Sequence, residues 1–411
     1  MSTTKVNTVI VGGGQAGVAA SGHLARAGVD HVVLEKSRIA EAWRTARWDS
    51  LVANGPAWHD RFPDKTFDDC GGDDFATKDG CARYFEDYVA EHELPVRTGV
   101  TVTRVAPGPA GGYLVDSSAG VFHADNVIAA TGPFPDPVIP PVVPADAPVA
   151  QMHSQTYRNP DQLADGAVLV VGAGSSGSQI ADELLRAGRK VFLSVGPHDR
   201  PPRRYRGKDF VFWLGVLGKW EMKTPPAGRE HVTIAVSGAY GGRTVDFRKF
   251  AERGMNLVGM TKAYADGRIS FEKDLAQNVN EGDENYLSLL AEADEWVERE
   301  GAGYPAEEDT KIIGPDPDCM TNPTLEIDLA AEGITTIIWA TGYRQDFSWL
   351  EVDSFDAKGA PRHHQGVSAV EGIYFLGLPW LSMRGSSFIW GVYVDAERIA
   401  GHIARRSALA A

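Results

Sequence analysis

The feature that most constrains the fold is the stretch Lys5–Glu35, whose pattern predicts a strand, a glycine turn, a helix and a second strand. Gly12, Gly14 and Gly17 follow an apolar run at G-x-G-x-x-G spacing. In dinucleotide-binding units, these glycines form a tight turn, let the backbone approach a pyrophosphate and let the helix pack closely on the strand. Glu35 ends the second strand, where such units place an acid on the ribose hydroxyls. The stretch therefore predicts a dinucleotide site.

The same pattern recurs after residue 160. Ala167–Val171 is an apolar strand, Gly172–Gly177 repeats the glycine spacing as G-A-G-S-S-G, and Ser178–Ala187 is expected to be helical. Lys190–Val195 then supplies the second strand. Because a chance glycine turn rarely recurs with its whole context, the repeat indicates two dinucleotide-binding units in one chain.

The two units differ in charge where the second strand ends. Glu35 closes the first, whereas Val195 stands at the matching position of the second and is followed by Arg200, Arg203 and Arg204. A carboxylate repels the 2′-phosphate of NADPH, and guanidinium groups bind it. We therefore expect FAD in the first unit and NADPH in the second, with a solvated basic loop as the alternative for the arginines. The sequence does not decide which arginine binds the phosphate.

The composition is that of a globular protein of two or three domains, with 411 residues of which 43% are hydrophobic and 23% charged. A net charge of −15 disfavours nucleic acid and anionic membrane as partners, since both attract basic surfaces. No apolar run reaches the roughly 18 residues of a membrane span, and the chain opens without a recognisable targeting segment. A cytoplasmic location is therefore expected.

The cysteine and histidine patterns argue against metal and disulfide chemistry. Cys70, Cys81 and Cys319 show no C-x-x-C spacing and no grouping with histidine that would suit a metal. The adjacent His363 and His364 have no recognisable third or fourth ligand and are interpreted as loop residues. We expect no metal site, and the isolated thiols argue against a disulfide reductase.

The domain organisation is inferred from a proline-dense segment, residues 133–144, that follows the buried strand Asn126–Ala130. Proline lacks the donor that a helix or central strand needs, so the segment is interpreted as a crossover between domains. The later strand Ile334–Ala340 ends in Ala-Thr-Gly like the earlier one and is interpreted as a return to the first domain. The expected class is α/β with two Rossmann-like domains. An FAD domain of residues 1–155 and 330–411 would then hold an inserted NADPH domain of residues 160–329.

Residues 208–300 are expected to form an insertion that shapes substrate choice. Its aromatic stretch Asp209–Trp220 is too short to span a bilayer. It could be core, a lid over the substrate entrance or an oligomer contact, ranked in that order.

The order of these motifs resembles the flavin-containing monooxygenases, which are class B flavoprotein monooxygenases. The resemblance is carried by G-G-G-Q-A-G at Gly12–Gly17, G-A-G-S-S-G at Gly172–Gly177 and W-A-T-G-Y at Trp339–Tyr343. The segment P-R-R-Y-R-G at Pro202–Gly207 is similar to the bacterial branch. The branch motif F-x-G-x-x-x-H-x-x-x-F/Y is degenerate here. His153 and Tyr157 fit its second half, while Ala147 and Val149 replace its Phe and Gly.

The resemblance implies that NADPH reduces FAD and that the reduced flavin takes up O2. The flavin C4a-(hydro)peroxide would then transfer one oxygen atom to a small organic substrate, an amine, a sulfide or an aromatic compound. Asn54 falls where the family has an asparagine beside the flavin, and it is the expected catalytic residue, with an Asx turn as its ordinary alternative. The expected cofactor contacts are Gly12, Gly14, Gln15, Ala16, Gly17, Glu35, Lys36, Trp43, Arg44, Thr131, Gly132, Gly172, Gly174, Ser175, Ser176, Gly177, Arg200, Arg203, Arg204, Thr341, Gly342 and Tyr343.

Two other functions remain open at this point. An NADPH-dependent flavin reductase or dehydrogenase would use the same cofactors without productive oxygen transfer. A redox-sensing protein would bind FAD and NADPH without turnover. The expected partners are a small-molecule substrate and O2, and the oligomeric state is left open, a homodimer included.

Overall fold

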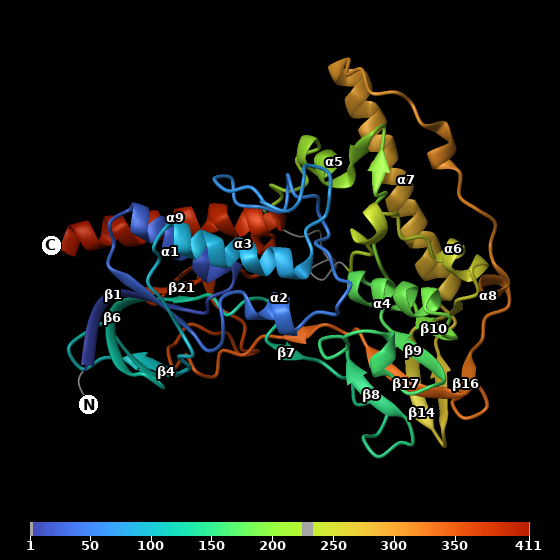
Figure 1. Ribbon diagram of the computed structural model, residues 1–411, viewed down its shortest axis with the longest axis horizontal. Coiled ribbons are helices and arrows are strands. Elements are labelled where there is room, and N and C mark those ends of the chain that lie inside the picture. Colours follow the sequence, from blue (N-terminus) through green and yellow to red (C-terminus); the bar gives the residue numbers. More distant parts are fainter. Residues whose placement is uncertain (1–2, 224–232, 411) are drawn as a thin grey trace.

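The computed structural model describes residues 3–223 and 233–410, which form two α/β units (Figure 1). The first unit is built on a sheet with the strand order β19-β20-β21-β6-β1-β2-β3, to which β5 and β4 are added through β6. Its strands are β1 (Thr3–Val11), β2 (His31–Glu35), β3 (Val96–Thr98), β4 (Val102–Pro107), β5 (Tyr113–Ser117), β6 (Gly120–Ala129), β19 (His363–His364), β20 (Val367–Ser368) and β21 (Ile373–Phe375).

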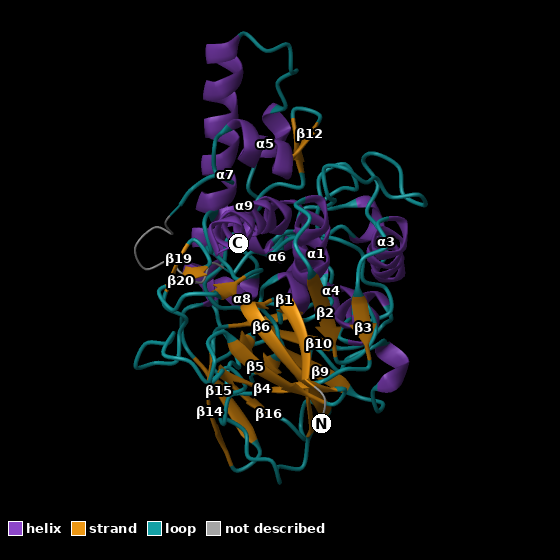
Figure 2. Cartoon of the chain, turned by 90° about the vertical axis from the view of Figure 1, so that its left-hand side faces the viewer, coloured by secondary structure: helices purple, strands orange, loops and turns teal. Residues whose placement is uncertain are grey.

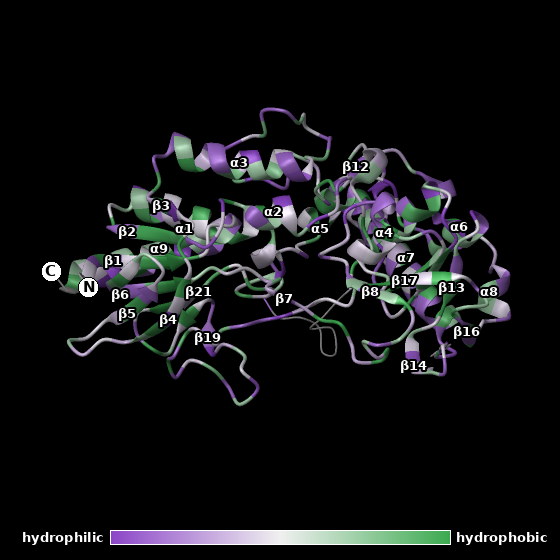
Figure 3. Cartoon of the chain, turned by 60° about the horizontal axis from the view of Figure 1, so that its bottom comes forward, coloured by the Kyte–Doolittle hydropathy of each residue, from purple (hydrophilic) through white to green (hydrophobic). Residues whose placement is uncertain are grey.

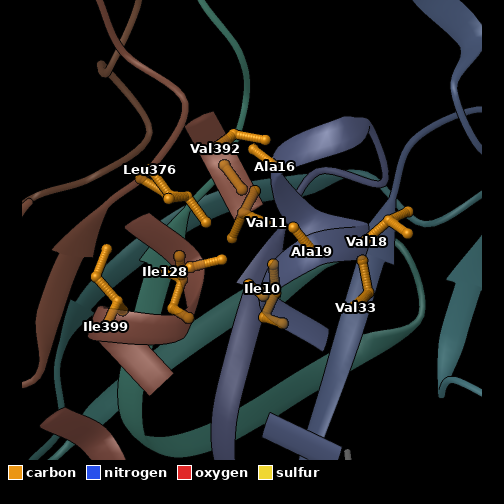
Figure 4. Close-up of a cluster of buried hydrophobic side chains, with 14 of the residues drawn as sticks. Ile10, Val11, Ala16, Val18, Ala19, Val33, Ile128, Leu376, Val392 and Ile399 are labelled. Carbon is orange, nitrogen blue, oxygen red and sulfur yellow. The ribbon is translucent and has the colours of Figure 1, made fainter. Parts of the chain in front are cut away.

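The centre of the first sheet is parallel and buried. Val11 of β1 pairs with Leu34 of β2 on one side and with Ala129 of β6 on the other. Helices α1 (Gln15–Arg26), α3 (Lys78–Glu91) and α9 (Ile389–Ala410) cover one face of this sheet (Figure 2). Central parallel strands are buried on both faces, which explains their continuous apolar runs. Figure 4 shows side chains from β1, α1 and α9, among them Ile10, Val18 and Ile399, packed into one core.

The second unit has a parallel sheet with the order β13-β10-β9-β17-β8. Successive side chains of a strand point to opposite faces. Val170 of β9 and Ile338 of β17 belong to the core that includes Leu184 of α4, while Leu169 and Ile337 belong to the opposite core. The elements are β8 (Ala150–His153), β9 (Ala167–Val171), β10 (Val191–Ser194), β13 (Asn256–Val258), β17 (Ile334–Trp339) and α4 (Ser175–Arg186).

The strand pairing moves the boundaries between the units. We expected Ile334–Ala340 in the first domain, but β17 lies between β9 and β8 in the second sheet. β8, which we placed within residues 1–155, also belongs to the second sheet. The chain crosses between the units at β7 (Asp136–Pro137) and β18 (Tyr343–Arg344), which pair with each other. Figure 3 shows this crossover at the junction of the two units.

The insertion packs as a core of its own. Trp213 of α5 (Phe210–Val216) is fully buried together with side chains of α7 (Leu275–Glu300), among them Leu289 and Leu290. The core interpretation of Asp209–Trp220 is therefore correct for its buried side chains. The remaining elements are α2 (Glu41–Thr45), α6 (Phe247–Glu252), α8 (Asp318–Thr321), β11 (Arg204–Tyr205), β12 (Lys208–Asp209), β14 (Thr261–Ala265), β15 (Arg268–Phe271), β16 (Glu326–Asp328) and the short 3-10 turns Pro160–Gln162, Ala239–Gly241, Glu308–Lys311 and Arg384–Ser387.

Over residues 3–223 and 233–410, none of the helices is both long enough and apolar enough to cross a membrane.

The position of β17 predicts a large stability effect at Ile338, which is 0% exposed between β9 and β8. Truncation of a buried isoleucine to alanine removes apolar contacts and leaves a cavity. Ile338→Ala should therefore lower the free energy of unfolding by about 2 to 5 kcal/mol, as measured by urea denaturation. The same change at Ile312, which is 72% exposed, is the control and should have little effect. Equal effects of the two changes would contradict the placement of β17.

Candidate cofactor sites and active site

The first glycine turn is tightly packed on one side and open on the other. Gly12 has a φ of +109°, which favours glycine, and a Cβ there would lie 2.5 Å from the carbonyl oxygen of Ala130. A Cβ at Gly17 would lie 1.8 Å from the carbonyl oxygen of Gly12, so only glycine lets α1 pack this closely on β1. At Gly14, no heavy atom of the described chain lies within 4 Å of such a Cβ. This open face at the N-terminus of α1 fits the pyrophosphate of FAD.

Glu35 is held at the end of β2 by two backbone donors. Its carboxylate accepts hydrogen bonds from the N–H of Gly13 at 2.6 Å and from the N–H of Ser37 at 2.7 Å. An ionised carboxylate has about four lone-pair positions, so the two bonds orient the group and leave acceptor capacity for ribose hydroxyls. The residues present therefore fit FAD in the first unit. The neighbouring Lys36 is exposed.

Gln15, Ala16 and Thr131 also lie at the first turn. Gln15 and Ala16 open α1, and the Gln15 side chain donates to the carbonyl oxygen of Ser387 at 2.9 Å. The Cα of Thr131, which precedes Gly132, lies 3.4 Å from the Cβ position of Gly12. These contacts bring the start of α1 beside the end of β6 and the start of α9.

Trp43 and Arg44 lie on α2, which is tied to the first turn through the N–H of Ala40 and the carbonyl oxygen of Gly13 at 3.0 Å. Trp43 is half-buried and packs against the cores of both units. Arg44 instead forms an ion pair of 2.5 Å with Glu86 of α3. The contact of Arg44 with the cofactor stays a prediction, and its ion pair lies within the first unit.

The second glycine turn repeats the packing of the first. Gly172 has a φ of +107°, and its Cβ would lie 2.5 Å from the carbonyl oxygen of Ala340. A Cβ at Gly177 would lie 1.8 Å from the carbonyl oxygen of Gly172. The Thr341 hydroxyl donates to the carbonyl oxygen of Val138 at 2.5 Å. Thr341 therefore lies between the second turn and the crossover, and not in the first unit where we expected its strand.

Gly342 and Tyr343 continue along the crossover. The Gly342 carbonyl oxygen lies 3.1 Å from Nε2 of His153, and the rings of His153 and Tyr343 are 4.9 Å apart. Burial lowers the pKa of His153 and raises the pKa of Tyr343, so both groups are favoured in their neutral forms. The histidine of the degenerate branch motif therefore supports the junction between the units.

The second turn differs from the first in that the chain covers it. The methyl group of Thr233 lies 2.8 Å from the Cβ position of Gly174. The Ser175 hydroxyl donates to the carbonyl oxygen of Ile234 at 2.7 Å, and Asp199 forms a β-bridge with Ile234. We call residues 233–236 the covering segment. The turn and helix fit a pyrophosphate, but the covering segment occupies the approach that is open at Gly14.

The arginines after the second strand are mostly used inside the protein. Arg200 is 2% exposed and donates to Asp283 at 2.7 Å, and Arg203 is 4% exposed and donates to Asp209 at 2.9 Å. Burial lowers the pKa of Arg203 and raises the pKa of Asp209, and the attraction between the two groups opposes both shifts. Arg200 and Arg203 are therefore ion-pair partners of the fold, which corrects their expected role. Arg204 is exposed, has no ion pair with another described residue and stays the candidate for the phosphate.

Asn54 lies between the two units. Its side-chain oxygen accepts a hydrogen bond of 2.9 Å from Gln179 of α4, and its carbonyl oxygen accepts one of 2.6 Å from Arg203. The same Gln179 amide donates to the carbonyl oxygen of Val236 at 2.7 Å. Gln179 thus links Asn54, the second helix and the covering segment.

The cysteines and the potential metal ligands, for which we expected no chemical role, are placed as follows. Cys70, Cys81 and Cys319 are free thiols, and burial strongly raises the pKa of Cys81. Within residues 3–223 and 233–410, no three potential ligands among His, Cys, Asp and Glu are grouped to hold a metal ion.

Sequence reasoning missed Gln179, the covering segment and the pair His59–Asp60, whose side chains lie 2.7 Å apart and whose carboxylate is bonded to Gly55, the residue after Asn54. Gln179 stands two residues after Gly177 in the helix, where it looks like an ordinary polar position. The covering segment has no motif, since it accepts its hydrogen bonds from Ser175 and Gln179 through backbone carbonyl groups. Only the adjacency of His59 and Asp60 is visible in the sequence, and such adjacency is a weak signal.

The fold and the two glycine turns define an oxidoreductase with two dinucleotide-binding units. Residues 9–214 match the family described as pyridine nucleotide-disulphide oxidoreductase, and the chain belongs to this family. Members of this family and flavin monooxygenases use FAD and NADPH. The comparisons thus confirm the two expected cofactors and the resemblance to flavin monooxygenases.

Three relatives illustrate this relationship. The chain is 32% identical over 403 residues to an uncharacterized oxidoreductase CzcO-like of Geobacillus kaustophilus, covering 97% of this chain and 98% of the relative. It is 32% identical over 425 residues to the indole-3-pyruvate monooxygenase YUCCA4 of Oryza sativa, covering 97% and 87%. A flavin-containing monooxygenase from Stenotrophomonas maltophilia superimposes with a TM-score of 0.68 at 19% identity, covering 98% and 100%, which shows the shared fold.

The open first turn predicts that FAD binding is sensitive to a methyl group at Gly14. Gly14 has a φ of −82°, so alanine fits the backbone, and the added methyl group would project toward the expected pyrophosphate. Gly14→Ala should fold with an unchanged melting temperature and lose flavin, as measured by absorbance at 450 nm after gel filtration. Gly17→Ala, with its Cβ 1.8 Å from a carbonyl oxygen, should instead impair folding. Full flavin retention by Gly14→Ala would contradict the assignment.

The covered second turn predicts that NADPH displaces residues 233–236. The N–H of Ala235 donates to the carbonyl oxygen of Asp199 at 2.8 Å, so this amide should exchange slowly without nucleotide. Saturating NADPH should speed its hydrogen exchange, as measured by mass spectrometry. A peptide from α7 is the control and should not change. Slower or equal exchange in the covering segment with NADPH bound would rule out the displacement.

Proposed function

We propose that this protein is an NADPH-dependent FAD monooxygenase that transfers one oxygen atom from O2 to a small organic substrate, an amine, a sulfide or an aromatic compound. When bound, NADPH supplies the hydride, and FAD carries the electrons to oxygen. The protein binds and orients both cofactors and excludes water from the reacting groups.

The observation that carries the proposal is the hydrogen bond between Asn54 and Gln179. Asn54 belongs to a loop of the first unit, and Gln179 lies in the second turn of α4, two residues after Gly177. A contact of 2.9 Å between them means that the edges of the two cofactor units meet at Asn54. Hydride transfer requires such a meeting, because the reacting atoms must approach to about 3 to 3.5 Å.

Each residue has a separate task in this proposal. The turn at Gly12–Gly17 and the carboxylate of Glu35 hold FAD. The turn at Gly172–Gly177, with Arg204 as the remaining cation, holds NADPH. The amide of Asn54 donates a hydrogen bond to the group from which oxygen is transferred, as the resemblance implies.

The names of the relatives support the aromatic option among the three substrate classes. The rice relative is named for the oxygenation of indole-3-pyruvate, an aromatic acid. The Geobacillus relative is named only as an oxidoreductase. This name fits an enzyme that transfers oxygen to a substrate and equally one that reduces its flavin without transferring oxygen.

A second candidate is an NADPH-dependent flavin oxidoreductase that does not transfer oxygen productively. The degenerate branch motif favours it, since Ala147 and Val149 replace the Phe and Gly of the monooxygenases. The two candidates share every cofactor contact. They differ in the fate of O2.

The two candidate functions are separated by measuring 18O incorporation into product and the hydrogen peroxide formed per NADPH consumed. With thioanisole, N,N-dimethylaniline and indole-3-pyruvate as test substrates, we expect at least one to give a product that carries one atom of 18O from 18O2. The hydrogen peroxide formed should then fall short of the NADPH consumed. Peroxide equal to NADPH with every test substrate would favour the oxidoreductase.

Asn54→Ala should retain FAD and its reduction by NADPH but shift the outcome from product to peroxide. The loss of one hydrogen bond, worth about 1 kcal/mol, should lower product formation about fivefold or more. Asn322→Ala, at an exposed asparagine, is the matched control and should behave as the unchanged protein. An unchanged ratio of product to peroxide in Asn54→Ala would remove Asn54 from the mechanism.

A further inference from the structure

His59 and Asp60 form a buried pair in the same loop as Asn54. Nδ1 of His59 lies 2.7 Å from Oδ1 of Asp60, and the His59 side chain is only 10% exposed. An ionised carboxylate accepts hydrogen bonds only, so a neutral His59 donates from Nδ1 and presents Nε2 as an acceptor. This Nε2 atom is buried and has no hydrogen-bond partner in the described part of the chain.

The pair is fixed to the loop that carries Asn54. Oδ2 of Asp60 accepts a hydrogen bond of 2.8 Å from the N–H of Gly55, the residue after Asn54. A Cβ at Gly55 would lie 2.4 Å from Oδ1 of Asp60, so the carboxylate lies directly against this backbone. The position of His59 is therefore coupled to the position of Asn54.

Aromatic rings from distant parts of the chain surround His59. Its ring centroid lies 5.4 Å from that of Trp220 and 5.7 Å from that of Trp390, and Trp220 lies 5.0 Å from Phe388. Arg384 lies over the Trp220 ring at 5.9 Å. We call His59, Trp220, Phe388 and Trp390 the aromatic cluster. It joins the Asn54 loop, the insertion and the start of α9.

The aromatic cluster holds a second unsatisfied polar atom, Nε1 of Trp390. Other buried tryptophans nearby are satisfied, since Trp213 donates to the Tyr205 carbonyl oxygen at 2.9 Å and Trp220 to the Val211 carbonyl oxygen at 3.1 Å. An unsatisfied buried donor or acceptor costs about 1 to 3 kcal/mol and is rare in native proteins. One such acceptor and one such donor in adjacent rings point to a ligand that supplies both partners.

The aromatic cluster also lies close to the first turn. Trp390 follows Ser387 by three residues, and the Ser387 carbonyl oxygen accepts the hydrogen bond from Gln15 at the start of α1. The aromatic cluster thus contacts the Asn54 loop on one side and is connected to the expected FAD site on the other.

We infer that the aromatic cluster binds a planar aromatic ligand that carries one hydrogen-bond donor and one acceptor. The ligand O–H or N–H donates to Nε2 of His59, its acceptor receives the N–H of Trp390, and its ring packs against Trp220. That this ligand is the substrate rests on the proposed function. The isoalloxazine ring of FAD has the same chemistry, and the experiment distinguishes the two sources.

The test compares 2-naphthol, which has a hydroxyl donor, with 2-methoxynaphthalene, which has none. Binding to the flavin-loaded protein is measured by isothermal titration calorimetry. We expect 2-naphthol to bind about tenfold more tightly. His59→Phe keeps a ring but removes the acceptor, so it should bring the ratio of the two affinities close to one. His364→Phe, at an exposed histidine, is the matched control and should keep the tenfold ratio.

Asp60→Asn provides a second variant that changes hydrogen-bond direction with little change in shape. The asparagine oxygen can still accept from Gly55, while its NH2 group faces Nδ1 of His59 and drives the ring proton to Nε2. The site should then favour quinoline, which only accepts, over 2-naphthol. This reversal would not follow from a merely structural role of the pair.

Two results would overturn the inference. One is equal binding of the two naphthalenes by the unchanged protein, and the other is a tenfold ratio that persists in His59→Phe. If that persistent ratio comes with a loss of flavin, or a shift of its absorption band, the contacts of His59 belong to FAD. The binding assay needs no turnover. A failure of oxygen transfer would therefore overturn the proposed function without affecting the interpretation of the naphthalene affinities.

Discussion

The close contact between the third glycine of each turn and the carbonyl oxygen of the first glycine determines the geometry of both cofactor units. A Cβ at Gly17 or Gly177 would lie 1.8 Å from that oxygen, which no side chain tolerates. The contact seats each helix on its strand so that the helix N-terminus ends at the carboxyl edge of the sheet. Donors and the positive end of the helix dipole are then directed to one place. Larger residues there would separate helix from strand and remove the phosphate site.

The two units share this contact but use charge differently around it. Glu35 is oriented by two backbone N–H groups and keeps acceptor capacity, as its place in the sequence predicts. Arg200 and Arg203 are of the residue type that binds phosphate groups. Each of them instead forms an ion pair with a buried carboxylate, that of Asp283 or Asp209. Asp283, the partner of Arg200, lies 83 residues away in the sequence. A run of basic residues in the sequence shows that positive charge is present. Only the fold shows whether that charge is paired with a carboxylate of the protein or is available to a ligand phosphate.

The sequence predicted the repeated strand, turn and helix because their pattern is local. It could not place β17, since Ile334–Trp339 is an apolar run that suits the centre of either parallel sheet. Pairing with β9 and β8, which are distant in the sequence, places β17 in the second sheet. The helix α7 begins at Leu275, although Asn278, Asn280 and Gly282 weaken the helical pattern of its first turns. Tertiary packing overrides that weak propensity, as the burial of Val279 shows.

The contacts of Gln179 couple the parts of the site that the sequence could not connect. One amide group donates both to the side chain of Asn54 and to the Val236 carbonyl oxygen of the covering segment. Movement of the covering segment would break the hydrogen bond from Gln179 to Val236. The Gln179 amide could then either shorten or lose its hydrogen bond to Asn54. Asn54 is in turn joined through Gly55 to the His59–Asp60 pair. Hydrogen bonds, each below 3 Å, therefore connect the covering segment through Gln179, Asn54, Gly55 and Asp60 to His59 of the aromatic cluster. The second cofactor unit and the aromatic cluster thus meet at the same loop of the first unit.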